Sequence, residues 1–204
     1  GNGPKLTISD AQPSDEGIYT LSISNAAGST ASDSVMLKVV VPPITNTGPV
    51  SLIVPLGEPT VQFDASFDGT PGTFQWKRGS SVVPGTAPTL NLTNVQLKDG
   101  GIYTVKSTNL GGYATTAGAE LIVVDRTSKI IVQPIRGKAV FTAITAGPIP
   151  QYEWRKNGVP LPQVLGKTEG VTTKTLTIKT LAPGDTDVYT CMITGAGGSL
   201  ETGN

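Results

Sequence analysis

The side chains of this sequence that could do chemistry are its carboxylates and a single cysteine, because the chain contains no histidine. The absence of histidine excludes histidine-based catalytic triads, the usual general base near neutral pH and the commonest metal ligand. Cys191 is the only cysteine, so it can form neither an intramolecular disulfide nor a zinc cluster. The simplest interpretation of Cys191 is a small buried apolar side chain.

Asp185 and Asp187 form a D-x-D pair, a pattern that could contribute ligands to a calcium site. Asp185 has equivalents in two earlier segments, Asp15 and Asp99, each four residues before a tyrosine. The second aspartate occurs in only one of these three copies. We therefore interpret the shared aspartate as a turn residue whose carboxylate accepts hydrogen bonds from backbone N–H groups.

Asp64 and Asp68 are a second carboxylate pair, and glycoside hydrolases place such pairs on either side of a cleft. Positions on one strand and the loop after it provide no cleft, so solvated side chains are the simpler interpretation. The run Gly195–Gly198 could be taken for a phosphate-binding loop, but no helix follows it to supply N-terminal amides. We predict no catalytic residue, no cofactor and no metal site.

The elements that must position these side chains recur three times along the chain. Each copy contains one of the tyrosines Tyr19, Tyr103 and Tyr189, which are separated by 84 and 86 residues. Residues of the same type recur at fixed offsets before each tyrosine. The recurring sets are Leu6, Leu90 and Leu176 at thirteen residues, Ile8, Leu92 and Ile178 at eleven, Ala11, Val95 and Leu181 at eight, and Asp15, Asp99 and Asp185 at four. A period of this length is typical of one small β-sandwich domain.

The composition also favours an all-β fold, since 25 glycines and 16 prolines suit many short strands joined by tight turns. The repeat predicts three units, which we call the first, second and third repeats. They are the C-terminal half of a domain (residues 1–41), a complete domain (42–125) and a domain that lacks the end of its last strand (126–204). We expect strands near residues 6–8, 19–23 and 35–39 in the first repeat and near residues 51–54, 60–67 and 74–77 in the second.

Aromatic residues mark the front halves of the second and third repeats. A phenylalanine precedes a tryptophan by thirteen residues in both, as Phe63 with Trp76 and as Phe141 with Trp154. A central tryptophan, an L-x-I strand and the sequence D-x-G-x-Y or D-x-D-x-Y together resemble tandem immunoglobulin-like domains of the intermediate set. The resemblance implies that the tyrosines are tyrosine corners, whose hydroxyls bond back to the preceding turn. The core residues that it implies are Trp76, Trp154, Tyr19, Tyr103, Tyr189, Phe63 and Phe141.

The chain departs from this family at its inter-sheet disulfide. The position two residues after each tyrosine holds Leu21, Val105 and Cys191, and the partner position in the earlier strand holds Ala65 and Ala143. Cys191 therefore faces an alanine and cannot be cross-linked. Cystine-free modules of this kind resemble those of bacterial surface and secreted proteins and of some phage virion proteins, so we expect relatives there.

The repeats and the absence of histidine favour a non-catalytic role. We expect a structural or adhesive segment of an extracellular or cell-surface array, with further copies of itself or neighbouring immunoglobulin-like domains as protein partners, in a homo-oligomer or fibre. Alternatives are accessory modules tethered to an enzyme domain outside this segment, and a phage decoration fibre. Fifteen basic and fifteen acidic residues give no surface suited to nucleic acid. No apolar run approaches the ~20 residues of a membrane-spanning helix.

One loop distinguishes the third repeat from the second. The spacing from Trp76 to Tyr103 is 27 residues, whereas Trp154 and Tyr189 are 35 residues apart. The extra length falls between the tryptophan strand and the strand that contains Leu176. An edge hairpin without a ligand is the simpler interpretation, and a partner-binding loop is the alternative. The loop consists of Gln163, Val164, Leu165, Gly166, Lys167, Thr168, Glu169, Gly170 and Val171.

The first repeat is predicted to carry an apolar face with no opposing sheet, because nothing before Leu6 supplies the front half of a domain. Such a face promotes aggregation unless it is covered. We therefore expect these 204 residues to be part of a longer polypeptide whose copies align end to end.

Overall fold

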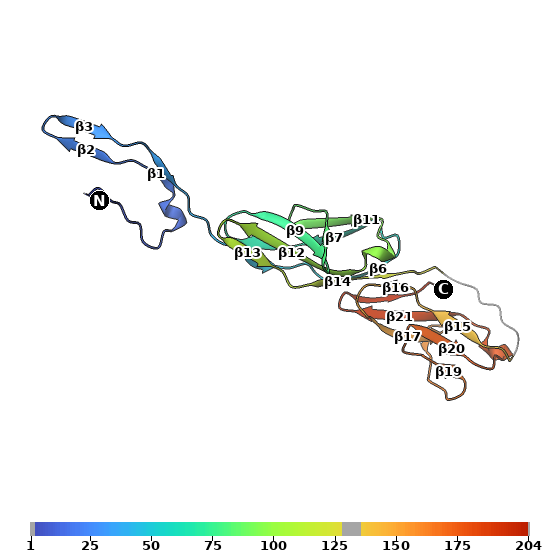
Figure 1. Cartoon of the computed structure of the whole chain (residues 1–204). Coiled ribbons are helices and arrows are strands. Elements are labelled where there is room, and N and C mark those ends of the chain that lie inside the picture. The colour runs from blue at the N-terminus through green and yellow to red at the C-terminus, as the bar shows by residue number, and fades with distance from the viewer. Residues whose placement is uncertain (1–2, 128–135, 204) are drawn as a thin grey trace.

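The computed structural model describes residues 3–127 and 136–203 of the chain. These residues form strands and three one-turn 3₁₀ helices, and the repeats follow one another along an elongated array (Figure 1). No helix within the described ranges is long and apolar enough to cross a membrane. The all-β fold class that the sequence predicts is therefore confirmed.

The first repeat contains two separate two-stranded sheets, in which the first strand pairs with the fourth and the second with the third. Its elements are η1 (Pro13–Asp15), β1 (Gly17–Tyr19), β2 (Ser22–Asn25), β3 (Gly28–Ala31) and β4 (Val35–Leu37). The strand expected at residues 6–8 is absent, and the prediction is wrong on this point. The physical reason is that none of the described residues provides a strand with which it could pair.

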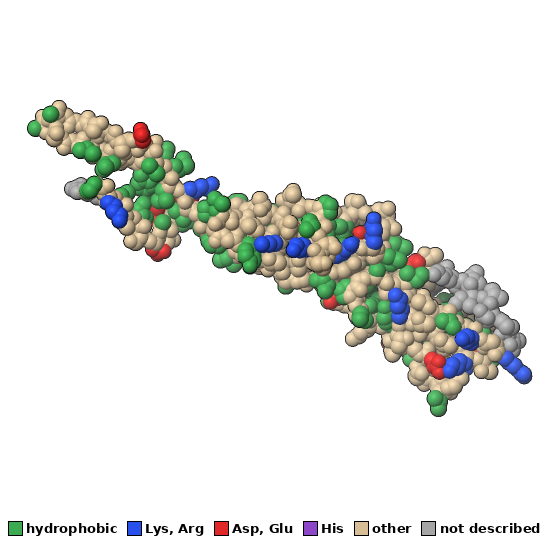
Figure 2. All heavy atoms as spheres, viewed as in Figure 1, with side chains coloured by type: hydrophobic (Ala, Val, Ile, Leu, Met, Phe, Trp, Pro, Cys, Tyr) green, Lys and Arg blue, Asp and Glu red, His purple; other side chains and the backbone are tan. Residues whose placement is uncertain are grey.

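Apolar side chains of the first repeat are consequently exposed, and Figure 2 shows them gathered on the visible face of this repeat. Leu6, Ile23 and Val35 are all more than half exposed, at 57%, 61% and 68%. Tyr19 is half-buried rather than enclosed. None of the described residues covers this face.

The second repeat is a two-layer sandwich. Its elements are β5 (Ile44–Thr47), β6 (Leu52–Pro55), β7 (Thr60–Asp64), β8 (Ser66–Asp68), β9 (Thr73–Arg78), β10 (Ser81–Val83), β11 (Thr89–Thr93), η2 (Leu97–Asp99), β12 (Gly101–Asn109), β13 (Gly112–Thr115) and β14 (Ala119–Val124). The larger sheet has the order β10-β9-β12-β14, with β13 also on β12 and β6 parallel to β14. The pairs β7–β11 and β5–β8 form the other layer. The sequence did not predict β5.

The third repeat has the same two-layer plan. Its elements are β15 (Ala139–Thr142), β16 (Thr145–Ala146), β17 (Gln151–Lys156), β18 (Val159–Pro160), β19 (Thr168–Glu169), β20 (Thr175–Ile178), η3 (Pro183–Asp185), β21 (Tyr189–Gly195) and β22 (Gly198–Glu201). One sheet has the order β15-β20-β19 and the other the order β18-β17-β21-β22. β16 pairs instead with β14 of the second repeat, so one sheet continues across the boundary between the two repeats.

Each sandwich core is built around its tryptophan. Trp76 is fully buried on β9, and Trp154 is 4% exposed on β17. The indole N–H of Trp76 donates to the carbonyl oxygen of Ala87 at 2.9 Å, and that of Trp154 donates to the carbonyl oxygen of Thr173 at 2.8 Å. Each indole therefore satisfies its one polar atom while the ring remains buried.

Each tyrosine is held by the 3₁₀ turn four residues before it. The tyrosine hydroxyl donates to the main-chain carbonyl of the turn aspartate in all three repeats. The pairs are Tyr19 with Asp15 at 2.7 Å, Tyr103 with Asp99 at 2.6 Å and Tyr189 with Asp185 at 3.1 Å. The aspartate carboxylates accept the backbone N–H of Gln12, Gln96 and Ala182, each at 2.8 Å. These bonds are the turn role that the recurring aspartate suggested.

Candidate functional site

The loop of residues 163–171 lies at the edge of the β15-β20-β19 sheet, where its short strand β19 pairs with β20. Not all of the loop is available to a partner. Thr168 is 5% exposed, and Val171 is part of the core of the third repeat. The loop buries these two side chains to attach itself to the sandwich, so a partner would contact the other residues of the loop. The tip is exposed, and the Leu165 side chain is fully in solvent.

The buried hydroxyl of Thr168 holds the tip in place. It donates to the carbonyl oxygen of Pro162 at 2.8 Å and accepts the backbone N–H of Val164 at 2.7 Å. On the other side of the loop, Glu169 forms an ion pair with Lys179, the residue after β20. The tip is thus an apolar side chain presented on a hydrogen-bonded loop, and such a loop loses little conformational entropy on binding.

Asp185 and Asp187, the candidate calcium ligands, are each paired with a lysine. Lys167 from the loop forms an ion pair with the Asp185 carboxylate, and Lys156 lies 3.4 Å from Asp187. Partial burial acts to raise the pKa of Asp185. Hydrogen bonds from Lys167 and the Ala182 N–H, with the nearby lysine charges, outweigh it and hold that pKa below the ordinary value. The lysines supply the positive charge that a cation would otherwise provide.

No group of three or more histidine, cysteine, aspartate or glutamate side chains is arranged to hold a metal ion within residues 3–127 and 136–203. Asp64, on β7, accepts hydrogen bonds from Gln62 and Thr89, and these bonds lower its pKa. A glycosidase acid needs a carboxyl with a raised pKa. The environment of Asp64 therefore favours a permanently charged surface group.

Cys191 is fully buried on β21, in the same core cluster as Ala143. Burial raises the pKa of its thiol to about 12, so the thiolate is not formed at neutral pH. Because the thiolate is the nucleophilic form, burial and the raised pKa both disfavour reaction of this thiol in the folded chain.

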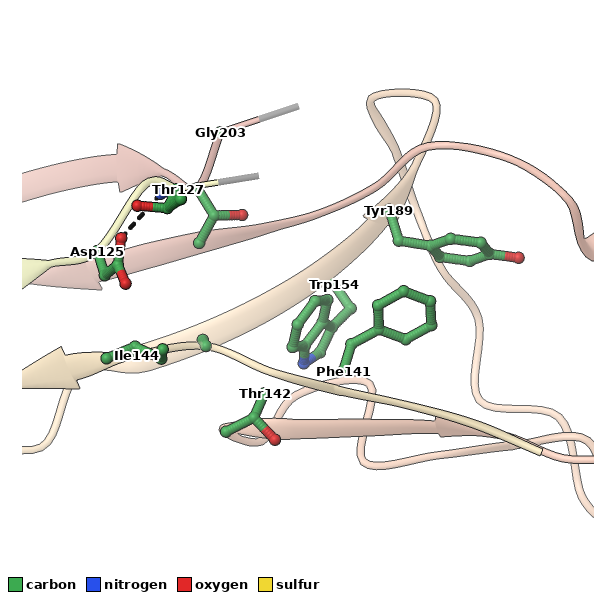
Figure 3. Close-up of a pocket in the computed structure, with 10 residues that line it drawn as sticks. Asp125, Thr127, Phe141, Thr142, Ile144, Trp154, Tyr189 and Gly203 are labelled. Atoms are coloured by element: carbon green, nitrogen blue, oxygen red, sulfur yellow. Dashed lines mark hydrogen bonds between the residues drawn. The ribbon is translucent and has the colours of Figure 1, made fainter. Parts of the chain in front are cut away.

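A small cavity of about 80 Å³ opens between the two sheets of the third repeat. Figure 3 shows the aromatic rings of Phe141, Trp154 and Tyr189 together on one side of it, with Asp125 and Thr127 on the other. Asp125 accepts the backbone N–H of Thr127 at 2.8 Å. The wall combines apolar core side chains with polar ones such as Thr142 and Thr202. No acid–base pair converges on it, so the cavity resembles a gap at the open edge of the sandwich.

The glycine run Gly195–Gly198 forms the turn between β21 and β22. Its role is close packing against the second repeat. A Cβ atom added to Gly195 would lie 2.2 Å from the Ile122 side chain, and one on Gly197 would lie 2.4 Å from the Leu52 backbone. The turn was predicted from the sequence, but this contact with the second repeat was not. The signal that could have suggested it is the uninterrupted apolar run 121–124, which is typical of a strand buried on both faces.

Residues 126–203 match the Immunoglobulin I-set domain family. Nearly the whole chain is similar to several animal proteins. It is 26% identical to muscle M-line assembly protein unc-89 of Caenorhabditis elegans over 99% of the chain. It is 29% identical to Hemicentin-2 of Mus musculus over 94% and 30% identical to Roundabout homolog 2 of Homo sapiens over 96%. The chain spans 3%, 4% and 16% of the lengths of these relatives, respectively.

The chain also resembles the crystal structure of Dpr2 Ig1–Ig2 in complex with DIP-Theta Ig1–Ig3. The TM-score is 0.51 at 19% identity, and the match covers 95% of this chain and 73% of that one. At this identity the likeness concerns the fold alone. With the two sandwich cores and the tyrosine corners, it defines the class: this protein consists of tandem immunoglobulin-like β-sandwich domains, and its third repeat matches the I-set family.

The expectation of bacterial or phage relatives is corrected by these matches, which are to nematode, mouse and human proteins. The absence of the inter-sheet disulfide did not indicate which group of organisms the relatives come from. Packing explains why a sandwich can dispense with it. Cys191 and its equivalent Val105 are both fully buried beside a tryptophan, so a small apolar side chain fills this position without a cross-link.

Proposed function

We propose that this chain is a non-catalytic segment of an extracellular or cell-surface array, in which the domains 1–41, 42–125 and 126–204 set the spacing between neighbouring parts of a longer protein. The supporting observation is the end-to-end arrangement of the repeats (Figure 1), with hydrogen bonds across the first junction. Burial of the Cys191 thiol suits an oxidising compartment, because a buried thiol is protected from forming mixed disulfides.

The junction between the first and second repeats is held by hydrogen bonds that Asn109 and Thr70 make with the backbone of Val41. The Asn109 amide donates to the carbonyl oxygens of Val41 at 2.8 Å and of Thr70 at 2.9 Å. The hydroxyl of Thr70 in turn accepts the backbone N–H of Val41 at 2.9 Å. These bonds fix the linker just before Pro42 and Pro43, which restrict its backbone further. The direction in which the second repeat leaves the first is therefore set by specific contacts.

Small-angle X-ray scattering of the whole chain tests the spacer role. We expect the wild-type profile to fit a single elongated particle, and the Asn109→Ala variant to show a broader distribution of bend angles because the amide bond to the Val41 carbonyl is lost. Asn46→Ala is the matched control, since Asn46 is an exposed asparagine on β5. A wild-type profile that fits only a freely hinged chain would contradict the proposal.

We further propose that the partner is a protein and that the tip of the 163–171 loop contributes to its binding. The Dpr2–DIP-Theta structure is a complex between two proteins with immunoglobulin domains, which supports a protein partner for a chain of the same fold. Leu165 is 102% exposed on a hydrogen-bonded loop, and an exposed leucine gains apolar burial when a partner covers it.

Clustering of beads coated with the whole chain tests whether the partner is a second copy. If it is, Leu165→Ser reduces clustering, whereas Leu110→Ser does not. Leu110 is the matched control because it is a loop leucine with 96% exposure in the second repeat. Equal clustering by the two variants would contradict a role of the loop in binding, and it would leave the proposed spacer role unaffected.

A further inference from the structure

The last strand of the second repeat, β14, contributes side chains to two different cores. Leu121 and Val123 belong to the core around Trp76. Ile122 and Val124 belong to the core around Trp154. All four apolar side chains are 0% or 1% exposed. The strand is thus buried on both faces, which is unusual in an antiparallel sandwich, where the outer face of a strand commonly contacts solvent.

The neighbouring strand β6 shows the same alternation. Leu52 and Val54 pack against the core of the second repeat, and Ile53 packs against that of the third. Backbone hydrogen bonds continue this arrangement. Val123 and Val124 of β14 pair with the two residues of β16, and the N–H of Asp125 donates to the carbonyl oxygen of Ile144 at 2.9 Å. The third repeat therefore has both side-chain and main-chain contacts with β14.

Glycines permit this close approach. A Cβ atom on Gly147 would lie 2.3 Å from the carbonyl oxygen of Leu121, and one on Gly100 would lie 2.6 Å from the backbone of Ala146. Gly195 and Gly197 contact β14 and β6 in the same manner. A larger residue at Gly100, Gly147 or Gly197 would meet backbone atoms and force the two repeats apart, whereas at Gly195 the Ile122 side chain would have to shift.

The first junction is built differently, although the repeats align. Lys38 stands nineteen residues after Tyr19, the position that Ile122 occupies after Tyr103. A lysine cannot enter a neighbouring core without losing the hydration of its charge. Asn109 correspondingly stands where the third repeat has Gly195, each six residues after its tyrosine.

The two junctions also differ in how far along the preceding repeat the contacted carbonyl lies. Gly69 and Gly147, each seven residues before a tryptophan, both approach a main-chain carbonyl that follows the tyrosine of the preceding repeat. Gly69 approaches that of Pro42, 23 residues after Tyr19. Gly147 approaches that of Leu121, 18 residues after Tyr103, which is five residues earlier in the repeat.

We propose that the second and third repeats unfold as one cooperative unit through the shared strand β14. Unfolding of either repeat alone would leave the other with Ile122 and Val124 exposed, or with part of its sheet unpaired. The free energy of each repeat is therefore linked to that of the other. This linkage depends on the contacts of β14 and its neighbour β6 with the third repeat, and it holds whatever the array binds.

Hydrogen exchange measured by mass spectrometry on the whole chain tests the proposal. Val105 and Cys191 are equivalent buried positions, two residues after the tyrosines of the second and third repeats. We expect Val105→Ala to speed exchange about tenfold or more in peptides from β9 and β12 and by the same factor in peptides from β17 and β21. Cys191→Ala should likewise speed exchange in both repeats. An effect confined to the repeat that carries the substitution would overturn the proposal.

A second variant tests the junction without altering either core. Gly197→Ala places a methyl group against the Leu52 backbone, so we expect it to divide the single unfolding transition into two. Gly184→Ala is the control, because a Cβ atom at Gly184 has no atom within 4 Å and its backbone needs no positive φ. Two transitions already present in the wild-type chain, or a Gly197→Ala transition that stays single, would count against the shared strand.

Discussion

The Tyr103 hydroxyl donates a hydrogen bond to the main-chain carbonyl of Asp99 at 2.6 Å. The Tyr103 ring stacks on Phe63 at the same time, with ring centroids 4.9 Å apart. One side chain thus links the turn before β12 to the opposite layer of the sandwich. Arg78 of β9 donates to the carbonyl of Lys98 in the same turn, and Lys156 donates to that of Gly184 at the equivalent point of the third repeat.

We expect Tyr103→Phe to lower the free energy of unfolding by about 1–2 kcal/mol, because the carbonyl of Asp99 loses its buried donor while the ring remains. Chemical denaturation followed by tryptophan fluorescence measures this change. Tyr113→Phe is the control, since Tyr113 is 67% exposed on β13, and it should leave the midpoint unchanged. Equal midpoints for the two variants would show that the corner bond does not stabilise the sandwich.

Replacement of Trp154 by alanine should destabilise the chain by roughly 3–5 kcal/mol through loss of apolar burial and creation of a cavity. Trp154→Phe separates packing from hydrogen bonding, because phenylalanine retains much of the ring volume but leaves the carbonyl of Thr173 without its indole donor. We expect an intermediate loss for this variant in thermal unfolding. A loss for phenylalanine as large as that for alanine would assign most of the effect to the hydrogen bond.

Acid should weaken the contact between the 163–171 loop and the η3 turn. The pKa of Asp185 is depressed in the folded chain, so the folded state favours its charged form. That contribution is present above the unfolded pKa of about 3.9 and is lost as the pH falls through the folded value. We expect Asp185→Asn to flatten the dependence of the unfolding midpoint on pH below about pH 4, whereas Asp33→Asn, at an exposed site, leaves it as in the wild type.

The Cys191 thiol should not react with a thiol reagent at pH 8 in the folded chain, and should react fully after unfolding. Its folded pKa of about 12 exceeds the unfolded value of about 8.5. The corresponding stability is complete below the unfolded pKa and is lost as the pH rises from there towards the folded pKa. Rapid labelling without denaturant, at a rate matching that of a small model thiol, would show that the site opens readily.

Three features were predictable from the sequence: the all-β repeats, the tyrosines with their turn aspartates, and the positions of Trp76 and Trp154. These features depend on local chemistry repeated at fixed spacing. An alternating L-x-I pattern predicts one buried face, and an aspartate four residues before a tyrosine predicts a turn. No contact between repeats is needed to predict them.

The failed strand at residues 6–8 shows one limit of such patterns. A β-strand is defined by its hydrogen-bonding partner. Leu90 and Leu92 lie in β11, which pairs with β7. Their equivalents in the first repeat, Leu6 and Ile8, have no partner strand among the described residues and form no strand. The 163–171 loop shows another limit. Its length is evident in the sequence, but only the structure shows that Thr168 and Val171 are buried and that Leu165 is not.

The junction between the second and third repeats was decided by the tertiary structure alone. The apolar run 121–124 indicates a strand buried on both faces but does not name what covers the second face. Gly195 and Gly197 indicate a turn but not the strands that lie against it. The reason is that hydrophobic burial is non-directional, so an apolar residue does not specify which surface will cover it. The covering residues come together only when the two sandwiches pack in one particular relative position.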